Sequence, residues 1–196
     1  AEPGALAARV EALEAEAPAP EAWQALLTDL QAAGDPLLLA RAHRLRCMGS
    51  LGEPATARQH AQAGLDAVGE ASPGERAGLL LCRGYLSEVA GEVAAALADY
   101  DQAIALAAAG REPATQAQAL ALRGEQRHLR GEYAAALEDL QAAYALQLDG
   151  GNASGQRYAL NAIANLYADS HVAQYDQALD YYRKIEAQRR AAGRTA

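Results

Sequence analysis

Residues 82–106 read CRGYLSEVAGEVAAALADYDQAIAL, and residues 122–146 read LRGEQRHLRGEYAAALEDLQAAYAL. Both stretches begin near an Arg-Gly pair, continue with Gly-Glu and then reach Ala-Ala-Ala-Leu at the same offset. A third copy spans 164–185, and a fainter fourth copy spans 43–65. Each copy holds one anchor alanine at the same place: Ala57, Ala96, Ala136 and Ala178. These alanines lie 39, 40 and 42 residues apart, so the chain repeats a unit of about 40 residues.

The composition predicts that each repeat is helical. Hydrophobic residues make up 51% of the chain, and they are mostly Ala and Leu, with no Phe and one Trp. Ala and Leu are strong helix formers, whereas strands favour β-branched and aromatic residues, which are scarce here. Each copy shows two amphipathic segments joined near Gly52, Gly91 or Gly131, with Ala173 at the corresponding place in the last copy. We therefore expect an all-α fold built from helix hairpins.

The small residues and their order resemble the tetratricopeptide repeat (TPR). The first helix of three copies carries a small residue where that family has one: Gly84, Gly124 and Ala164. The second helix carries the anchor alanine and then a large residue: Tyr100, Leu140 and Tyr182. The unit is longer than the ~34 residues of the usual TPR, as in the TPR-like repeats of kinesin light chains and of bacterial sensor and regulator domains. This resemblance implies a right-handed α-solenoid of TPR-like hairpins with about ten helices.

The resemblance divides the chain into an N-terminal helix pair and an array of repeats. Residues 4–16 and 21–33 have helical periodicity on either side of a Pro-containing break, so residues 1–35 are expected to cap the array. Trp23 is expected to pack in the core of this pair, with a ligand role as the alternative. The array covers residues 36–196 as one continuous solenoid. Its four repeats are expected at about 36–70, 73–110, 113–150 and 153–193.

The last predicted helix, about 174–191, has no polar capping helix after it. It carries Leu179, Tyr182 and Ile185, and solenoids usually need a polar cap. We infer that the chain is a fragment of a longer protein, or that a partner covers this end, for example a second copy in a homodimer. The same region is rich in basic residues: Arg183, Lys184, Arg189, Arg190 and Arg194. These suit the negative end of the helix dipole, with a polyanion site as the alternative.

Charge and motifs argue against several classes of function. The net charge of −8 at pH 7 disfavours nucleic acid or an anionic membrane as the main partner, since both favour clustered Lys and Arg. No apolar run approaches the ~18 residues needed to cross a bilayer. The sequence contains no phosphate-binding glycine loop, HExxH or GxSxG motif, and its four histidines are scattered. We therefore expect no enzymatic activity, no cofactor and no metal site.

The two cysteines, Cys47 and Cys82, have no partner at the CxxC spacing of a metal site. We expect two buried free thiols, with a disulfide or a redox role as the alternatives. The chain begins with Ala-Glu-Pro, a start that suits cleavage by a signal peptidase. This start slightly favours a periplasmic or extracytoplasmic location over the cytoplasm.

Two arginines recur in the central copies, each followed by an aspartate at the same distance. By resemblance to a TPR hairpin, these positions meet between its two helices. Arg83 is therefore expected to pair with Asp99, and Arg123 with Asp139. We expect these pairs to be structural, with a functional role as the alternative.

A stack of TPR hairpins lines its concave surface with the first helix of each hairpin. By this resemblance, the candidate groove consists of Arg46, Leu81, Tyr85, Glu88, Gln118, Glu125, His128, Tyr158, Asn161, Asn165 and Asp169. Asn161 and Asn165 are four residues apart, so they share a helix face on which two amides can bind the backbone of an extended peptide. The alternative is that they satisfy backbone carbonyls in an irregular last repeat. Arg46 is a lone cation for an acidic ligand group.

The leading hypothesis is a non-enzymatic module that binds a protein or peptide segment in this groove. The array also resembles the N-terminal sensor regions of some bacterial diguanylate cyclases, which would make it the input domain of a larger signalling protein. The alternative is a small-molecule-sensing or dimerisation domain of a bacterial signalling enzyme or transcription regulator. A transmembrane segment later in the full chain favours the cyclase, and a helix-turn-helix favours the regulator.

Overall fold

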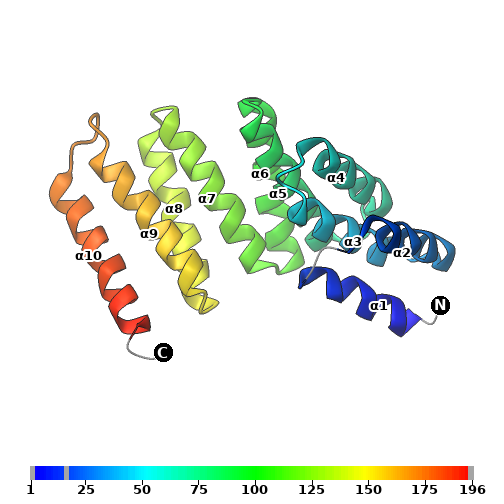
Figure 1. Cartoon of the computed structure of the whole chain (residues 1–196). Helices are drawn as coiled ribbons and strands as arrows, with labels where there is room; N and C mark the ends of the chain where they lie inside the picture. Colours follow the sequence, from blue (N-terminus) through cyan, green and yellow to red (C-terminus); the bar gives the residue numbers. More distant parts are fainter. Residues whose placement is uncertain (1–2, 16–17, 194–196) are drawn as a thin grey trace. The chain divides into compact units, whose positions relative to one another are not determined.

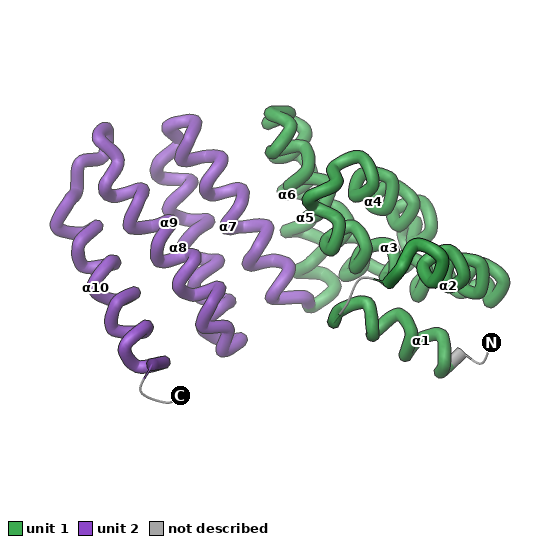
Figure 2. Tube along the Cα trace, viewed as in Figure 1, with its two compact units in different colours: residues 1–111 green, residues 112–196 purple. Residues whose placement is uncertain are grey.

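The computed structural model describes residues 3–15 and 18–193, and every regular element in this part of the chain is helical (Figure 1). These described residues form ten α-helices, and within each of the two units below successive helices pack against each other, so the predicted all-α, solenoid-like fold is confirmed. The chain separates into two compact units, residues 1–111 and 112–196 (Figure 2). In the described residues no helix combines the length and the apolar character that a membrane crossing requires.

Unit 1 contains six α-helices and one short 3₁₀ helix, Ala12–Glu14. The α-helices are α1 (Pro3–Glu11), α2 (Pro20–Ala33), α3 (Pro36–Gly49), α4 (Pro54–Val68), α5 (Pro73–Val89) and α6 (Val93–Gly110). The helices α3 and α4 form one hairpin, α5 and α6 form the next, and α4 packs along α5. The pair α1 and α2 also packs against α3, but over a shorter stretch.

Unit 2 contains two further hairpins. Its helices are α7 (Pro113–Leu129), α8 (Tyr133–Asp149), α9 (Ala153–Ala168) and α10 (Tyr175–Ala192). The helices pair as α7 with α8 and α9 with α10, and α8 packs along α9. The helix boundaries follow from local chemistry, because proline occupies the first turn of α2, α3, α4, α5 and α7, where its missing N–H is not needed.

Three of the hairpin turns, α5–α6, α7–α8 and α9–α10, use the left-handed backbone region. Gly91 and Gly131 both have φ of 77°, and the residue that replaces glycine in the last hairpin, Ala173, has φ of 52°. Glycine adopts this region without steric cost, whereas an alanine there is strained by about 1 kcal/mol. The turn between α9 and α10 therefore keeps the backbone geometry of the other turns without their glycine.

Small residues bring the two helices of each hairpin close together. A β-carbon added to Gly84 of α5 would lie 2.7 Å from Cε1 of Tyr100 on α6. A β-carbon added to Gly124 of α7 would lie 2.9 Å from Cγ of Leu140 on α8. Tyr100 and Leu140 are both fully buried. These glycines therefore leave room for the large side chain that fills each hairpin.

We expect Gly84→Ala to lower the free energy of unfolding by about 2 kcal/mol, because the new methyl group overpacks a rigid aromatic contact. Gly49→Ala is the matched control, since Gly49 also lies in a helix but has nothing within 4 Å of its added β-carbon. This control is expected to be neutral or slightly stabilising, as alanine is the better helix former. Urea unfolding of both variants measures the difference, and equal stabilities would contradict the close contact.

Both predicted ion pairs are present. Arg83 donates from Nε and Nη2 to the two carboxylate oxygens of Asp99, at 2.8 and 2.7 Å. Arg123 does the same to Asp139, at 2.8 and 2.6 Å. A second arginine that we did not predict, Arg127, donates to Asp139 Oδ2 at 2.8 Å. Each pair joins the first helix of a hairpin to the second, as the resemblance to a TPR hairpin implied.

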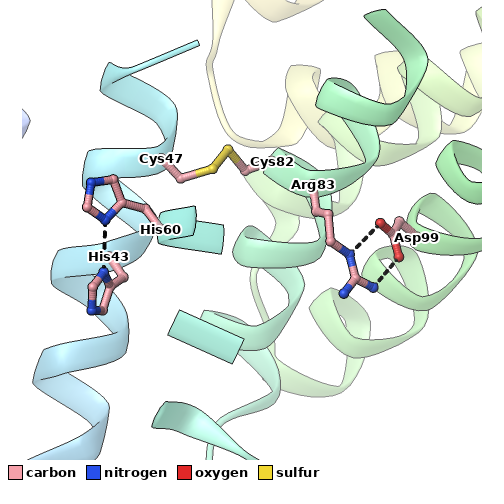
Figure 3. Close-up of a disulfide and its surroundings, with 6 residues drawn as sticks. All are labelled: His43, Cys47, His60, Cys82, Arg83 and Asp99. Atoms are coloured by element: carbon pink, nitrogen blue, oxygen red, sulfur yellow. Dashed lines mark hydrogen bonds and ion pairs between the residues drawn. A yellow bond between two sulfur atoms is a disulfide. The ribbon is translucent and has the colours of Figure 1, made fainter. Parts of the chain in front are cut away.

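The expectation of two free thiols is wrong, because Cys47 of α3 and Cys82 of α5 form a disulfide (Figure 3). Both residues are fully buried, as expected, and their Cα atoms lie 6.5 Å apart. They meet because α3 and α5, the first helices of neighbouring hairpins, lie against each other. The structure therefore contains the disulfide, which was one of the alternatives to two free thiols.

The last helix, α10, buries only part of its apolar side chains. Ile185 is 6% exposed, so it belongs to the interior of the hairpin. Leu179 and Tyr182 are 47% and 39% exposed, and Tyr175 on the same side of the helix is 61% exposed. Leu140, which corresponds to Tyr182 in the preceding hairpin, is fully buried. The apolar residues on this face of α10 are therefore more exposed than their counterparts on α8.

Candidate functional site

The clearest candidate surface lies in unit 2, on the solvent-facing side of α9. Leu160, Ile163 and Ala164 are buried, and this places Asn161 and Asn165 on the opposite, exposed side. Tyr158 begins the exposed row and is 45% exposed, and Asp169 follows the end of the helix. We call Tyr158, Asn161, Asn165 and Asp169 the α9 row. It presents one aromatic ring, two amides and one carboxylate.

The two asparagines of the row differ in their bonding. Asn165 accepts a hydrogen bond at Oδ1 from the hydroxyl of Tyr182 on α10, at 2.7 Å. This contact fixes the orientation of the amide, so its NH₂ group remains available to donate. The side chain of Asn161 has no hydrogen-bond partner among the residues that the structure describes. Neither asparagine satisfies a backbone carbonyl there, which was the alternative explanation for the pair.

The first residue of the row is tied to α7. The hydroxyl of Tyr158 donates to Oε2 of Glu125 at 2.6 Å, so two predicted groove residues contact each other across neighbouring first helices. Glu125 is half-buried, and Gln118, also on α7, is exposed. The ring of Tyr158 is thereby held in one orientation beside the asparagines.

The last residue of the row, Asp169, joins a cluster of two histidines and a tyrosine. Its Oδ2 lies 3.1 Å from Nε2 of His128, and its Oδ1 accepts from the backbone N–H of His171 at 2.8 Å. The same oxygen lies 3.1 Å from Nδ1 of His171 and accepts from the hydroxyl of Tyr133 at 3.3 Å. These bonds, chiefly from the backbone N–H of His171 and then from His128, lower the pKa of Asp169 to about 2. Asp169 is therefore a carboxylate at any ordinary pH.

Sequence reasoning placed His128 and Asp169 at this site but missed Tyr133 and His171. Tyr133 is the first residue of α8, and His171 lies in the turn where the last repeat is longer than its sisters. The longer turn of the last repeat was the sequence feature that could have revealed His171, because extra residues in a turn place new side chains beside the end of the preceding helix.

The predicted groove residues of unit 1 are less exposed. Leu81 is 5% exposed and packs in the interior, so it adds no side chain to an open surface. Tyr85 and Glu88 are half-buried, and Glu88 accepts a hydrogen bond from the buried hydroxyl of Tyr100 at 2.6 Å. The guanidinium of Arg46 lies over the ring of Trp23, 5.9 Å from its centroid. Contacts within the unit therefore occupy most of these residues.

A second polar cluster, which the sequence did not indicate, lies under Trp23. Nδ1 of His43 on α3 is 3.1 Å from Nδ1 of His60 on α4 (Figure 3). Trp23 of α2 packs edge-on against both imidazoles, with ring centroids 5.8 and 5.2 Å apart. Burial, and then the neighbouring His60, lower the pKa of His43 to about 4. Burial, and then Arg46, lower the pKa of His60.

Within the described residues, no group of three or more His, Cys, Asp or Glu side chains could hold a metal ion. Two surface hollows of about 330 and 420 Å³ are lined by residues 173–177 and by a stretch of α10 that includes Arg183 and Arg190, rather than by the α9 row.

Comparison with known proteins does not place the chain in a family: no family model matches it, and no curated protein matches it. Any function must therefore be argued from the residues of the chain itself.

Proposed function

We propose that unit 2 binds an extended segment of a partner protein along the α9 row. Two features of the asparagines carry this proposal. Asn161 is exposed and its side chain has no partner in the described part of the chain, and Asn165 is oriented by Tyr182. An exposed amide held by a neighbouring side chain loses little freedom when it binds, so the cost of ordering it is small. The module is then a TPR-like scaffold without catalytic activity.

The spacing of the row suits a peptide backbone. Residues four apart on an α-helix are about 6 Å apart along its axis. An extended peptide repeats every two residues, over about 6.6 Å. Asn161 and Asn165 can therefore bind successive backbone groups that point to the same side, since each amide both donates and accepts. Such contacts recognise the extended conformation rather than a particular sequence, and the ring of Tyr158 supplies an apolar neighbour.

We further propose that the protein works in an oxidising compartment. The support is the disulfide between Cys47 and Cys82, because cytosolic thiols are normally kept reduced. An extracytoplasmic binding module suits the sensory input domain of a larger signalling protein, such as a bacterial diguanylate cyclase. The exposed apolar face of α10 favours a contact with a further chain, as in a homodimer, and so supports the dimerisation alternative.

The proposal predicts that Asn161→Ala combined with Asn165→Ala weakens peptide binding by about tenfold or more, because up to four backbone hydrogen bonds of about 1 kcal/mol each are lost. The measurement uses unstructured 12-residue peptides selected from a random library on the wild-type chain, with affinities determined by calorimetry. Tyr182→Phe removes the hydroxyl that orients Asn165, and we expect a smaller loss from it.

Gln141→Ala is the matched control, because Gln141 is an exposed amide on α8, outside the α9 row. Its affinity is expected to equal that of the wild type. If the double variant retains its helicity and binds the selected peptides with unchanged affinity, the α9 row is not the binding surface.

A further inference from the structure

We propose that the N-terminal helix pair, α1 and α2, is an acid-released cover over α3, and that the His43 and His60 side chains are the switch. The device lies in unit 1 and is separate from the α9 row. Four observations support it: the contact between the two imidazoles, their enclosure by Trp23, the charge beside them, and the disulfide that holds α3 in place.

The contact between the imidazoles depends on protonation. The Nδ1 atoms lie 3.1 Å apart, so one nitrogen donates its proton and the other accepts with its lone pair. One added proton places a positive charge on a pair whose two members are shielded from water to different degrees, since His43 is 6% exposed and His60 is half-buried. A second proton turns both nitrogens into donors and removes the hydrogen bond altogether. The docked arrangement therefore favours neutral histidines.

The side chains around His43 and His60 do not neutralise the positive charge that protonation would add. Trp23 of α2 faces both rings, and the side chain of Leu79 on α5 approaches the same gap between α3 and α4. The charged group nearby is Arg46 of α3, which repels an imidazolium. Neither His43 nor His60 forms an ion pair with a carboxylate in the described part of the chain. Protonation of the histidines at low pH therefore adds positive charge next to Arg46, which is also positive.

The cover is the element that can move. Trp23 joins Leu6 and Val10 in an apolar cluster that closes over Ala42 of α3, and these contacts hold α1 and α2 in place. α3 itself is fixed, because Cys47, one turn after His43, is bonded to Cys82 of α5. Release of the pair exposes the face of α3 that carries Ala42 and Arg46. Arg46 is one of the predicted groove residues.

The size of the effect follows from the pKa of His43, about 4 when docked against 6.5 when free in water. A lowered histidine pKa means that docking is strongest above pH 6.5 and weakens as the pH falls toward 4. By this linkage, His43 alone reduces the docking equilibrium by at most about 30-fold between pH 7.5 and pH 5, because the part of the shift caused by His60 and by packing on α4 persists after release. His60, whose pKa is also lowered, adds to the loss in the same direction.

The experiment uses the single tryptophan of the chain, Trp23. We expect its emission to shift to the red on acidification from pH 7.5 to 4.5, with a midpoint between 4 and 6.5. Far-UV circular dichroism is expected to lose no more helicity than α1 and α2 contribute. The variant His43→Phe keeps a buried ring without a titrating nitrogen, and its midpoint is expected to move to lower pH. His171→Gln, which removes an exposed histidine of unit 2, is the control and keeps the wild-type midpoint.

Hydrogen exchange of the wild-type chain gives a readout that does not depend on a variant. Corrected for intrinsic rates, residues 20–33 are expected to lose protection at pH 5 while residues 73–89 keep theirs. Three results would overturn the proposal: constant Trp23 emission in acid, loss of α2 and α5 protection together, or a wild-type midpoint in His43→Phe.

Discussion

Reduction of the Cys47–Cys82 disulfide is expected to lower the free energy of unfolding of unit 1 by about 3 to 4 kcal/mol. The bond joins residues 35 apart, and opening a loop of that length returns conformational entropy to the unfolded chain. Trp23, which lies in unit 1, follows this transition by fluorescence during urea unfolding with and without a phosphine reductant. Because both cysteines are fully buried, we also expect reduction to be slow in the absence of urea.

The double variant Cys47→Ala with Cys82→Ala provides the control, because the reductant has no bond to break in it. Its unfolding midpoint is expected to be low and insensitive to the reductant. A wild-type chain whose midpoint stays the same in both conditions would show that the bond does not contribute to stability.

The substitution Asp139→Asn is expected to cost about 3 kcal/mol. The Asp139 carboxylate is 4% exposed and accepts hydrogen bonds from Arg123 and Arg127, so an amide in its place leaves two guanidinium groups without their counter-charge. Thermal unfolding followed by circular dichroism at 222 nm measures the loss.

Asp99→Asn is the comparison, since Asp99 has the same place in the preceding repeat but pairs with Arg83. The Arg83 side chain is 35% exposed and can regain water, so we expect a smaller loss. The triple variant Arg123→Leu, Arg127→Leu and Asp139→Leu is expected to recover part of the stability, because a buried ion-pair network can be replaced by apolar packing only when all of its members are replaced. Equal losses at Asp99 and Asp139 would show that the second arginine contributes nothing.

The parts of the structure that recur in the sequence could be predicted from it. The anchor alanines, Gly84 with Gly124, and the arginine-aspartate pairs each appear at least twice, at intervals of about 40 residues, so the same place in each repeat could be compared. The helical fold could be predicted from the composition and the amphipathic periodicity, and both ion pairs from the resemblance of the repeated unit to a TPR hairpin.

The parts that occur once could not be predicted in this way. Cys47 lies in the faintest repeat, and no sister position hints at its bond to Cys82. The cluster of Trp23, His43 and His60 depends on how a helix pair outside the repeat pattern packs on α3. A single contact between distant residues leaves no periodic signal, so such contacts become visible only when the helices are placed in space.

The disulfide also has a mechanical consequence. Because it joins α3 to α5, a pulling force along the chain bypasses α4 and the residues between the two cysteines. About 35 residues of chain, some 120 Å when extended, cannot be drawn out of the oxidised protein. The hairpin of α3 and α4 can partly unfold under force, but it cannot separate from the hairpin of α5 and α6. The disulfide therefore keeps these two hairpins of unit 1 covalently joined under tension.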